Sequence, residues 1–241
     1  MKLNTIYSKM KAFTLAEVLL VVAIIGITAA IALPNLSQNV DEDNYIMLTK
    51  TPYNELDSGF ARMLANKSLE EIYTDAGATT SAAKAKAIVD ELSKYIKMGT
   101  NCGNSISQCY NSSKKYTEAD GSEIDNKTWQ ESHSNGAAFT LPSGAVVIVD
   151  MYYSIAPRVD FDVDGVKGPC KCNVDIFRAV INDDNFDTLT ADLYYFAQGT
   201  KRGGNSSFDI NYDGLGWVLS IGNMDYLHCN NLNWSTKHQC D

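Results

Sequence analysis

The sequence predicts an α+β protein with a long N-terminal helix that continues into a globular head with an antiparallel sheet, closed by disulfides. Three observations support this class: an apolar run near the N-terminus, helical spacing of apolar residues after it, and strand-like alternation with turn signals in the last hundred residues. The chain has 241 residues, of which 45% are hydrophobic and 20% charged, so it can bury a core of its own. We expect a membrane-spanning helix over 13–34 and a head over 35–241. Within the head, 35–100 should be helical, 101–137 loop-rich and 138–241 strand-rich.

The apolar run covers residues 13–33 and contains a single ionisable side chain, Glu17. A helix of this length covers about 30 Å, which is the thickness of a bilayer's hydrocarbon core. Basic residues precede the run and acidic residues follow it. By the positive-inside rule the chain crosses a membrane once, with its N-terminus in the cytoplasm. Everything after Pro34 should then be exported.

The charge balance argues against a nucleic-acid-binding head. The chain carries 20 Lys and Arg against 29 Asp and Glu, a formal net charge of -9. A surface built for phosphate backbones would be basic and would place aromatic residues among its basic ones. Only the pairs Lys114-Lys115 and Lys201-Arg202 approach that pattern, so no direct nucleic-acid partner is expected.

Glu17 separates the possible roles of the N-terminal segment. A carboxylate in an apolar helix costs about 2.5–3.5 kcal/mol on membrane insertion, so a segment that served only as an anchor would not need it. The apolar run is also longer than the 7–15 residues usual in a signal peptide, although Ala30-Ile31-Ala32 offers a cleavage site before Leu33. A signal peptide and a plain anchor remain as alternatives.

The residues around Glu17 carry a family resemblance. Residues 11–20 read KAFTLAEVLL, which resembles the processing motif of type IV prepilins and type II secretion pseudopilins. The resemblance implies that a prepilin peptidase removes 1–12 as a cytoplasmic leader, cuts after Ala12 and methylates Phe13. It makes Glu17 the fifth residue of the mature chain, where the family carries Glu. This chain departs from the family in having Ala12, where Gly is usual.

The same resemblance implies a structural role and a set of partners. Glu17 would meet the new amino group of a neighbouring subunit and report correct register in a filament. Gly26 and Pro34 lie where family members carry residues that loosen the helix. The implied partners are the prepilin peptidase, other pilin or pseudopilin subunits, an inner-membrane assembly platform and the lipid bilayer. The head would be periplasmic or extracellular and not enzymatic, and its size favours a minor subunit.

A different class of function stays open beside this one. The helix could serve only as a tether or signal peptide for a binding module, for example a calcium-dependent adhesin. A third possibility, a tethered thiol oxidoreductase, would need thiols at Cys170 and Cys172. The sequence contains no Gly-rich phosphate loop, G-x-S-x-G elbow or H-E-x-x-H motif, so no catalysis is expected.

All six cysteines lie after the apolar run, and an even number in an exported segment favours disulfides. Two short loops are the natural pairs, Cys102 with Cys109 and Cys229 with Cys240. Each would stabilise the fold by about 2–3 kcal/mol. Cys170 and Cys172 are separated by one residue, which strains a direct bridge. We expect Cys170 and Cys172 either to depart from the simple scheme, in which all six cysteines form three short-range disulfides, or to form a strained disulfide.

The head begins with two predicted helices. Apolar residues at helical spacing continue from residue 37 to about 66, and Pro52 should kink or interrupt this helix. A second helix is predicted over 81–97, with Ser81 as its cap and Gly99 as its end.

The strands follow. Residues 138–141 and 145–149 should form a hairpin around the turn Pro142-Ser143-Gly144. Further strands are expected over 158–163, 193–196 and 217–221.

One segment resembles part of a calcium site. Asp160, Asp162 and Asp164, followed by Gly165, match the first half of an EF-hand loop, whose alternating oxygens suit calcium. Lys171 stands where the closing Glu belongs, so no EF-hand is predicted. A turn with solvated acids is the preferred interpretation, with calcium as the alternative. His133, His228 and His238 show no metal-binding spacing, and no cofactor is expected.

Overall fold

The computed structural model of the chain describes residues 15–110, 115–117, 121–124, 133–151, 157–165, 167, 170–181, 189–190 and 214–241, with no side-chain description at 28–41 and 189–190. The chain divides into two compact units, residues 1–42 and 43–241. The predicted strand at 193–196 lies outside the described residues.

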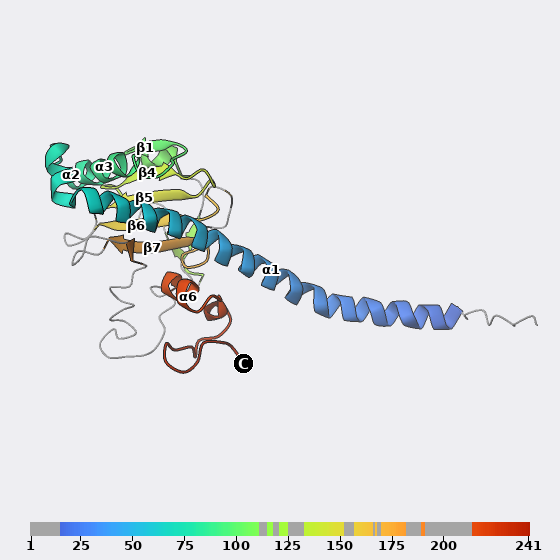
Figure 1. Cartoon of the computed structure of the whole chain (residues 1–241). Coiled ribbons are helices and arrows are strands. Elements are labelled where there is room, and N and C mark those ends of the chain that lie inside the picture. Colours follow the sequence, from blue (N-terminus) through green and yellow to red (C-terminus); the bar gives the residue numbers. More distant parts are fainter. Residues whose placement is uncertain are drawn as a thin grey trace, which may run out of the picture. The chain divides into compact units, whose positions relative to one another are not determined.

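Helix α1 is a single helix from Leu15 to Asn66 that belongs to both units (Figure 1). It runs through Pro34 and Pro52 without a break, so of the two outcomes predicted for Pro52, a kink or an interruption, the interruption is wrong. A proline removes only one helical N–H. Pro52 is buried, and the hydroxyls of Thr49 and Thr51 donate to carbonyls four residues earlier, at 2.6 and 3.0 Å. In the part of the chain that the structure describes, no helix has both the length and the apolar character of a membrane span.

Two short helices follow α1. Helix α2 spans Leu69–Asp75 and begins with a capping box, in which Ser68 and Glu71 each accept from the other's backbone N–H. Helix α3 spans Ser81–Leu92, and its cap is Thr80 instead of the predicted Ser81. It ends five residues earlier than predicted, because the backbone after Leu92 tightens into turns.

The head is built on a six-stranded sheet in the order β1-β4-β5-β6-β7-β8, with every neighbouring pair antiparallel. Its strands are β1 (Asn101–Gly103), β4 (Ala137–Thr140), β5 (Val146–Asp150), β6 (Arg158–Asp162), β7 (Ile176–Ile181) and β8 (Leu189–Thr190). The predicted hairpin is therefore confirmed as β4 and β5, and the third predicted strand as β6. Gly144 has φ +96°, a left-handed conformation that favours glycine in the tight turn between β4 and β5.

The first face of the sheet packs against the helices. The row Val147, Phe161 and Phe177 crosses β5, β6 and β7 in register, and it joins Phe60 of α1 and Leu92 of α3 in one buried core. Figure 1 shows the second half of α1 lying across this sheet. Period-two alternation places the residues between these apolar ones on the opposite face.

Small elements accompany the second face. They are the short helix η1 (Ile106–Gln108) and the two-stranded ribbon of β2 (Tyr116–Thr117) and β3 (Glu123–Ile124). Tyr110 and Tyr116 are buried in a second apolar cluster with Ile148 and Ile176 of the sheet. The second face is therefore also partly covered, even though it carries charged residues.

The last predicted strand, 217–221, is wrong. The segment forms helix α6, Gly214–Ser220, whose first five residues are buried, with Trp217 fully enclosed. A short apolar run with an aromatic residue fits either a buried strand or a buried helix turn, and here the helix packs on the core. The 3-10 helix η2 (Asp225–Leu227) follows it.

Candidate functional site

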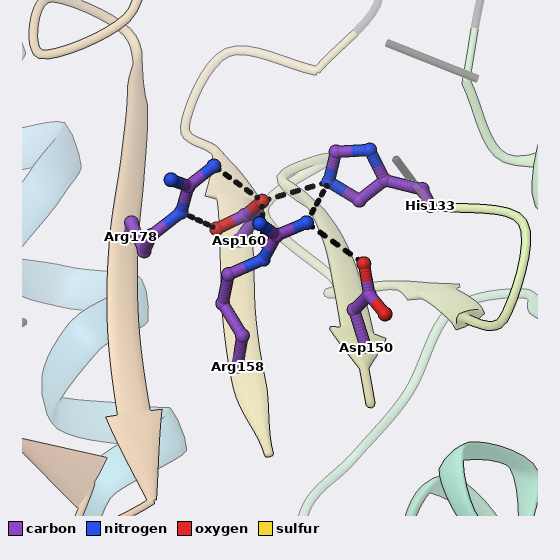
Figure 2. Close-up of polar contacts among 5 residues, drawn as sticks. All are labelled: His133, Asp150, Arg158, Asp160 and Arg178. Atoms are coloured by element: carbon purple, nitrogen blue, oxygen red, sulfur yellow. Dashed lines mark hydrogen bonds and ion pairs between the residues drawn. The ribbon is translucent and has the colours of Figure 1, made fainter. Parts of the chain in front are cut away.

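A cluster of charged side chains, buried except for Arg178, lies on the second face of the sheet (Figure 2). Asp150 comes from β5, Arg158 and Asp160 from β6, and Arg178 from β7, while His133 reaches in from the turn before β4. Because the register pairs Asp150 with Arg158 and Asp160 with Arg178, the sheet itself brings opposite charges together.

Asp160 is the centre of this cluster. Arg178 donates to its two oxygens at 2.8 and 3.2 Å, and Arg158 Nε lies 3.3 Å from Oδ2. His133 Nε2 lies 2.7 Å from the same Oδ2 and 3.2 Å from an Arg158 nitrogen. Since one ring nitrogen cannot donate and accept at once, the shorter distance favours donation to Asp160. Arg158 also donates to Asp150 at 2.7 Å.

Burial and charge act in opposite directions on the two acids. Burial raises the pKa of Asp160, but Arg158, Arg178 and His133 outweigh it and hold that pKa well below its usual range. For Asp150, burial is the dominant effect and raises the pKa, although Arg158 and His133 lower it in part. Two carboxylates and two guanidinium groups balance in charge when the imidazole is neutral.

The geometry makes this cluster a link between the sheet and the turn at His133, because its charges are directed at one another. Sequence reasoning missed it. The alternation of Arg158, Asp160 and Asp162 with apolar residues did indicate a polar strand face, but nothing local indicated that this face would be covered.

The predicted calcium residues are split between two environments. Asp160 is bound by two arginines, whereas Asp162 and Asp164 lie near Asp175. Burial, together with the carboxylates of Asp175 and Asp164, raises the pKa of Asp162 to about 8. Burial also raises the pKa of Asp175 to about 6. Among the described residues, no group of three His, Cys, Asp or Glu side chains is placed to hold a metal ion. Calcium binding stays a prediction.

The turn part of the interpretation of this segment has direct support, but the expected solvation of its acids is wrong for Asp160, which is 2% exposed. Gly165 has φ +67°, and β6 ends just before it at Asp162. Asp164 accepts a long hydrogen bond, 3.5 Å, from the hydroxyl of Tyr45 on α1.

Both predicted short disulfides are confirmed. Cys102 is joined to Cys109 and Cys229 to Cys240. Cys170 and Cys172 are thiols in the structure, so the third pair departs from the simple scheme as expected.

The N-terminal segment presents an apolar surface. Ala12 and Phe13 lie outside the described residues, and Glu17 is an exposed residue in the first turn of α1. Every large aliphatic side chain from Leu15 to Ile27 is at least half exposed, and the exposed fractions at the two ends are 78% for Leu15 and 63% for Ile27. A contiguous apolar surface of this extent requires lipid or protein to cover it.

Comparison with protein families matches this segment. A family model described as "Prokaryotic N-terminal methylation motif" matches residues 7–33. Residues 7–33 are a prepilin-type methylation motif. No curated protein and no solved structure matches the chain. The motif is the signature of type IV prepilins and pseudopilins, whose members are structural proteins.

The methylation motif includes Gly26, whose surroundings are open: a Cβ built there meets no atom within 4 Å. Pro34 lies just after the matched residues, inside α1. The helix continues through both positions, so neither residue ends it in the isolated chain.

Proposed function

We propose that this chain is a structural subunit, a minor pilin or a pseudopilin, of a type IV pilus or type II secretion-like filament. A prepilin peptidase cuts it after Ala12 and methylates Phe13. The observation that carries the proposal is the methylation motif at 7–33 together with the acid Glu17 on an otherwise apolar helix face. The chain then resides in the bacterial inner membrane as a single-pass protein before it enters the filament, with its head periplasmic or extracellular.

Glu17 gives the assembly its register. Cleavage would create a positive amine on Phe13, and a neighbouring subunit staggered along the filament would bring that amine to the carboxylate. A charge inside an apolar bundle is strongly unfavourable without its counter-charge, so subunits out of register are rejected. The two disulfides of the head support export, because such bonds persist in oxidising compartments.

The first experiment determines the mature N-terminus. We expect N-terminal sequencing and intact mass, in a strain with a prepilin peptidase, to give a methylated Phe13. A chain beginning at Leu33 would mean a signal peptide, and an uncut chain would mean a plain anchor. Either result would contradict the proposal.

The second experiment separates assembly from anchoring. Glu17→Gln should abolish incorporation into filaments while leaving the protein in the membrane fraction, whereas Glu55→Gln, a matched change further along α1, should assemble normally. If Glu17→Gln assembles as well as the parent chain, the helix serves only as a tether, and a binding module becomes the better explanation.

A further inference from the structure

The segment Cys170-Lys171-Cys172 is fixed by hydrogen bonds on both sides. Thr117 of β2 donates its N–H to the carbonyl of Cys170 at 3.1 Å and accepts from the N–H of Cys172 at 2.9 Å. This is a parallel bridge between Thr117 and Lys171, which requires an extended backbone at Lys171. The bridge ties the β2–β3 ribbon to the loop before β7.

The carboxylate of Asp175 fixes the same segment from the other direction. It accepts the N–H of Cys170 at 2.8 Å and also that of Lys171. Cys170 has φ +57°, a left-handed conformation that is uncommon for a residue with a side chain. The peptide groups on both sides of Lys171 are therefore already held by hydrogen bonds to Thr117 and Asp175.

This backbone opposes a disulfide between the two cysteines. Two extended residues span about 6.6–7.2 Å, whereas disulfides join Cα atoms usually about 4.4–6.8 Å apart. The two disulfides of the head have Cα separations of 5.9 and 5.8 Å. Closing the third pair therefore requires Lys171 to bend, and bending turns its flanking peptide groups away from Thr117.

The two thiols differ in access. Cys170 is 1% exposed, and its thiol lies 4.0 Å from a carboxylate oxygen of Asp162. Cys172 is partly exposed. Because burial disfavours a thiolate and blocks access to Cys170, Cys172 is the residue suited to attack an external disulfide.

We propose that Cys170 and Cys172 are a reversible redox pair whose oxidation releases the β2–β3 ribbon from the loop before β7. The Cys172 thiolate attacks a disulfide of a donor, such as oxidised glutathione or a protein disulfide, and one donor thiol leaves. The Cys170 thiolate then attacks the Cys172 sulfur and displaces the second donor thiol. Two electrons pass to the donor, which ends as two thiols carrying the protons of the pair. This inference is independent of the filament role.

The test uses the full-length protein in detergent, equilibrated in glutathione buffers from reducing to oxidising. We expect the peptide that contains Cys170 and Cys172 to lose about 2 Da and to stop reacting with an alkylating reagent, reversibly. Hydrogen exchange at the Thr117 amide should accelerate by at least about tenfold in the oxidised form. If the pair stays alkylatable in every buffer, or if it closes while Thr117 exchange is unchanged, the proposal is wrong.

Single substitutions test the roles of the two thiols. Cys170→Ser should accumulate a glutathione adduct at Cys172, whereas Cys172→Ser should form none at Cys170. Equal labelling of both variants would overturn the assignment. Intact disulfides elsewhere and a tryptophan emission spectrum equal to that of the parent chain show that each variant has folded, which keeps a folding failure distinct from a negative result.

Discussion

Replacing Asp160 by Asn tests the charge cluster on the second face of the sheet. Asn has nearly the same shape but removes the carboxylate that lies against all three of Arg158, Arg178 and His133. Asp160 is 2% exposed, so the substitution removes a buried negative charge that offsets the positive charges of Arg158 and Arg178. Removing one partner of a buried ion pair typically costs about 3–5 kcal/mol.

The structure places the expected loss at the lower end of that range. The Arg178 side chain is 35% exposed and can turn towards water, and Arg158 keeps Asp150. Arg158 then shares its buried position with one carboxylate instead of two, so we expect Asp160→Asn to lower the free energy of unfolding by about 3 kcal/mol. For a domain of this size that corresponds to roughly 6–12 °C in Tm.

The assay is thermal and urea unfolding of the full-length protein in detergent, followed by tryptophan fluorescence, to which the buried Trp217 contributes. The matched control is Asp90→Asn, which breaks the surface ion pair with Lys86. The side chains of Asp90 and Lys86 are 47% and 49% exposed. That change should cost less than about 1 kcal/mol. A loss below about 1 kcal/mol for Asp160→Asn, or an equal loss for both variants, would refute the reasoning.

Three further predictions concern the head. Gly59→Ala places a Cβ in steric overlap with a methyl of Ile96. We expect this overpacking to exceed the helix-propensity gain and lower the unfolding free energy by about 1–2 kcal/mol in urea titrations; an unchanged midpoint would contradict tight packing of α1 there. Asp162 and Asp175 have pKa values raised to about 8 and about 6, so the folded state binds more protons than the unfolded state between about pH 4 and 8. Tm should therefore fall as the pH rises from 5.5 to 8.5, and a flat or rising Tm would argue against the buried acids. Cys229→Ser opens the C-terminal disulfide and should cost about 2–3 kcal/mol in urea unfolding under non-reducing conditions; a cost under about 1 kcal/mol would mean that the loop is held by its other contacts.

Local sequence patterns predicted the elements whose signals are local. The hairpin of β4 and β5 follows from apolar runs around a Pro-Ser-Gly turn, and the two short disulfides follow from loop length. Helix α2 was missed although its capping box, Ser68 with Glu71, is readable in the sequence. That signal lies so close to the end of α1 that the helical spacing of the longer helix obscured it.

The remaining errors arise from tertiary contacts. Trp217 and its neighbours have strand-like composition, but the segment forms a helix because packing on the core decides between the two. The charged face of β6 looks solvent-exposed in sequence, but residues from other parts of the chain, His133 and Arg178 among them, lie against Asp160, which is buried. The sequence of a single strand does not show which other segments of the chain cover its faces.

The strand order has a consequence for how this head reaches its fold. From β4 to β8 each strand pairs with the next one in the chain, so this part of the sheet needs no long loop closure and can form from one end as the chain emerges. Both disulfides join cysteines only 7 and 11 residues apart. Oxidation can therefore close each of them inside its own loop before the sheet is complete, and neither bond has to wait for distant segments to meet.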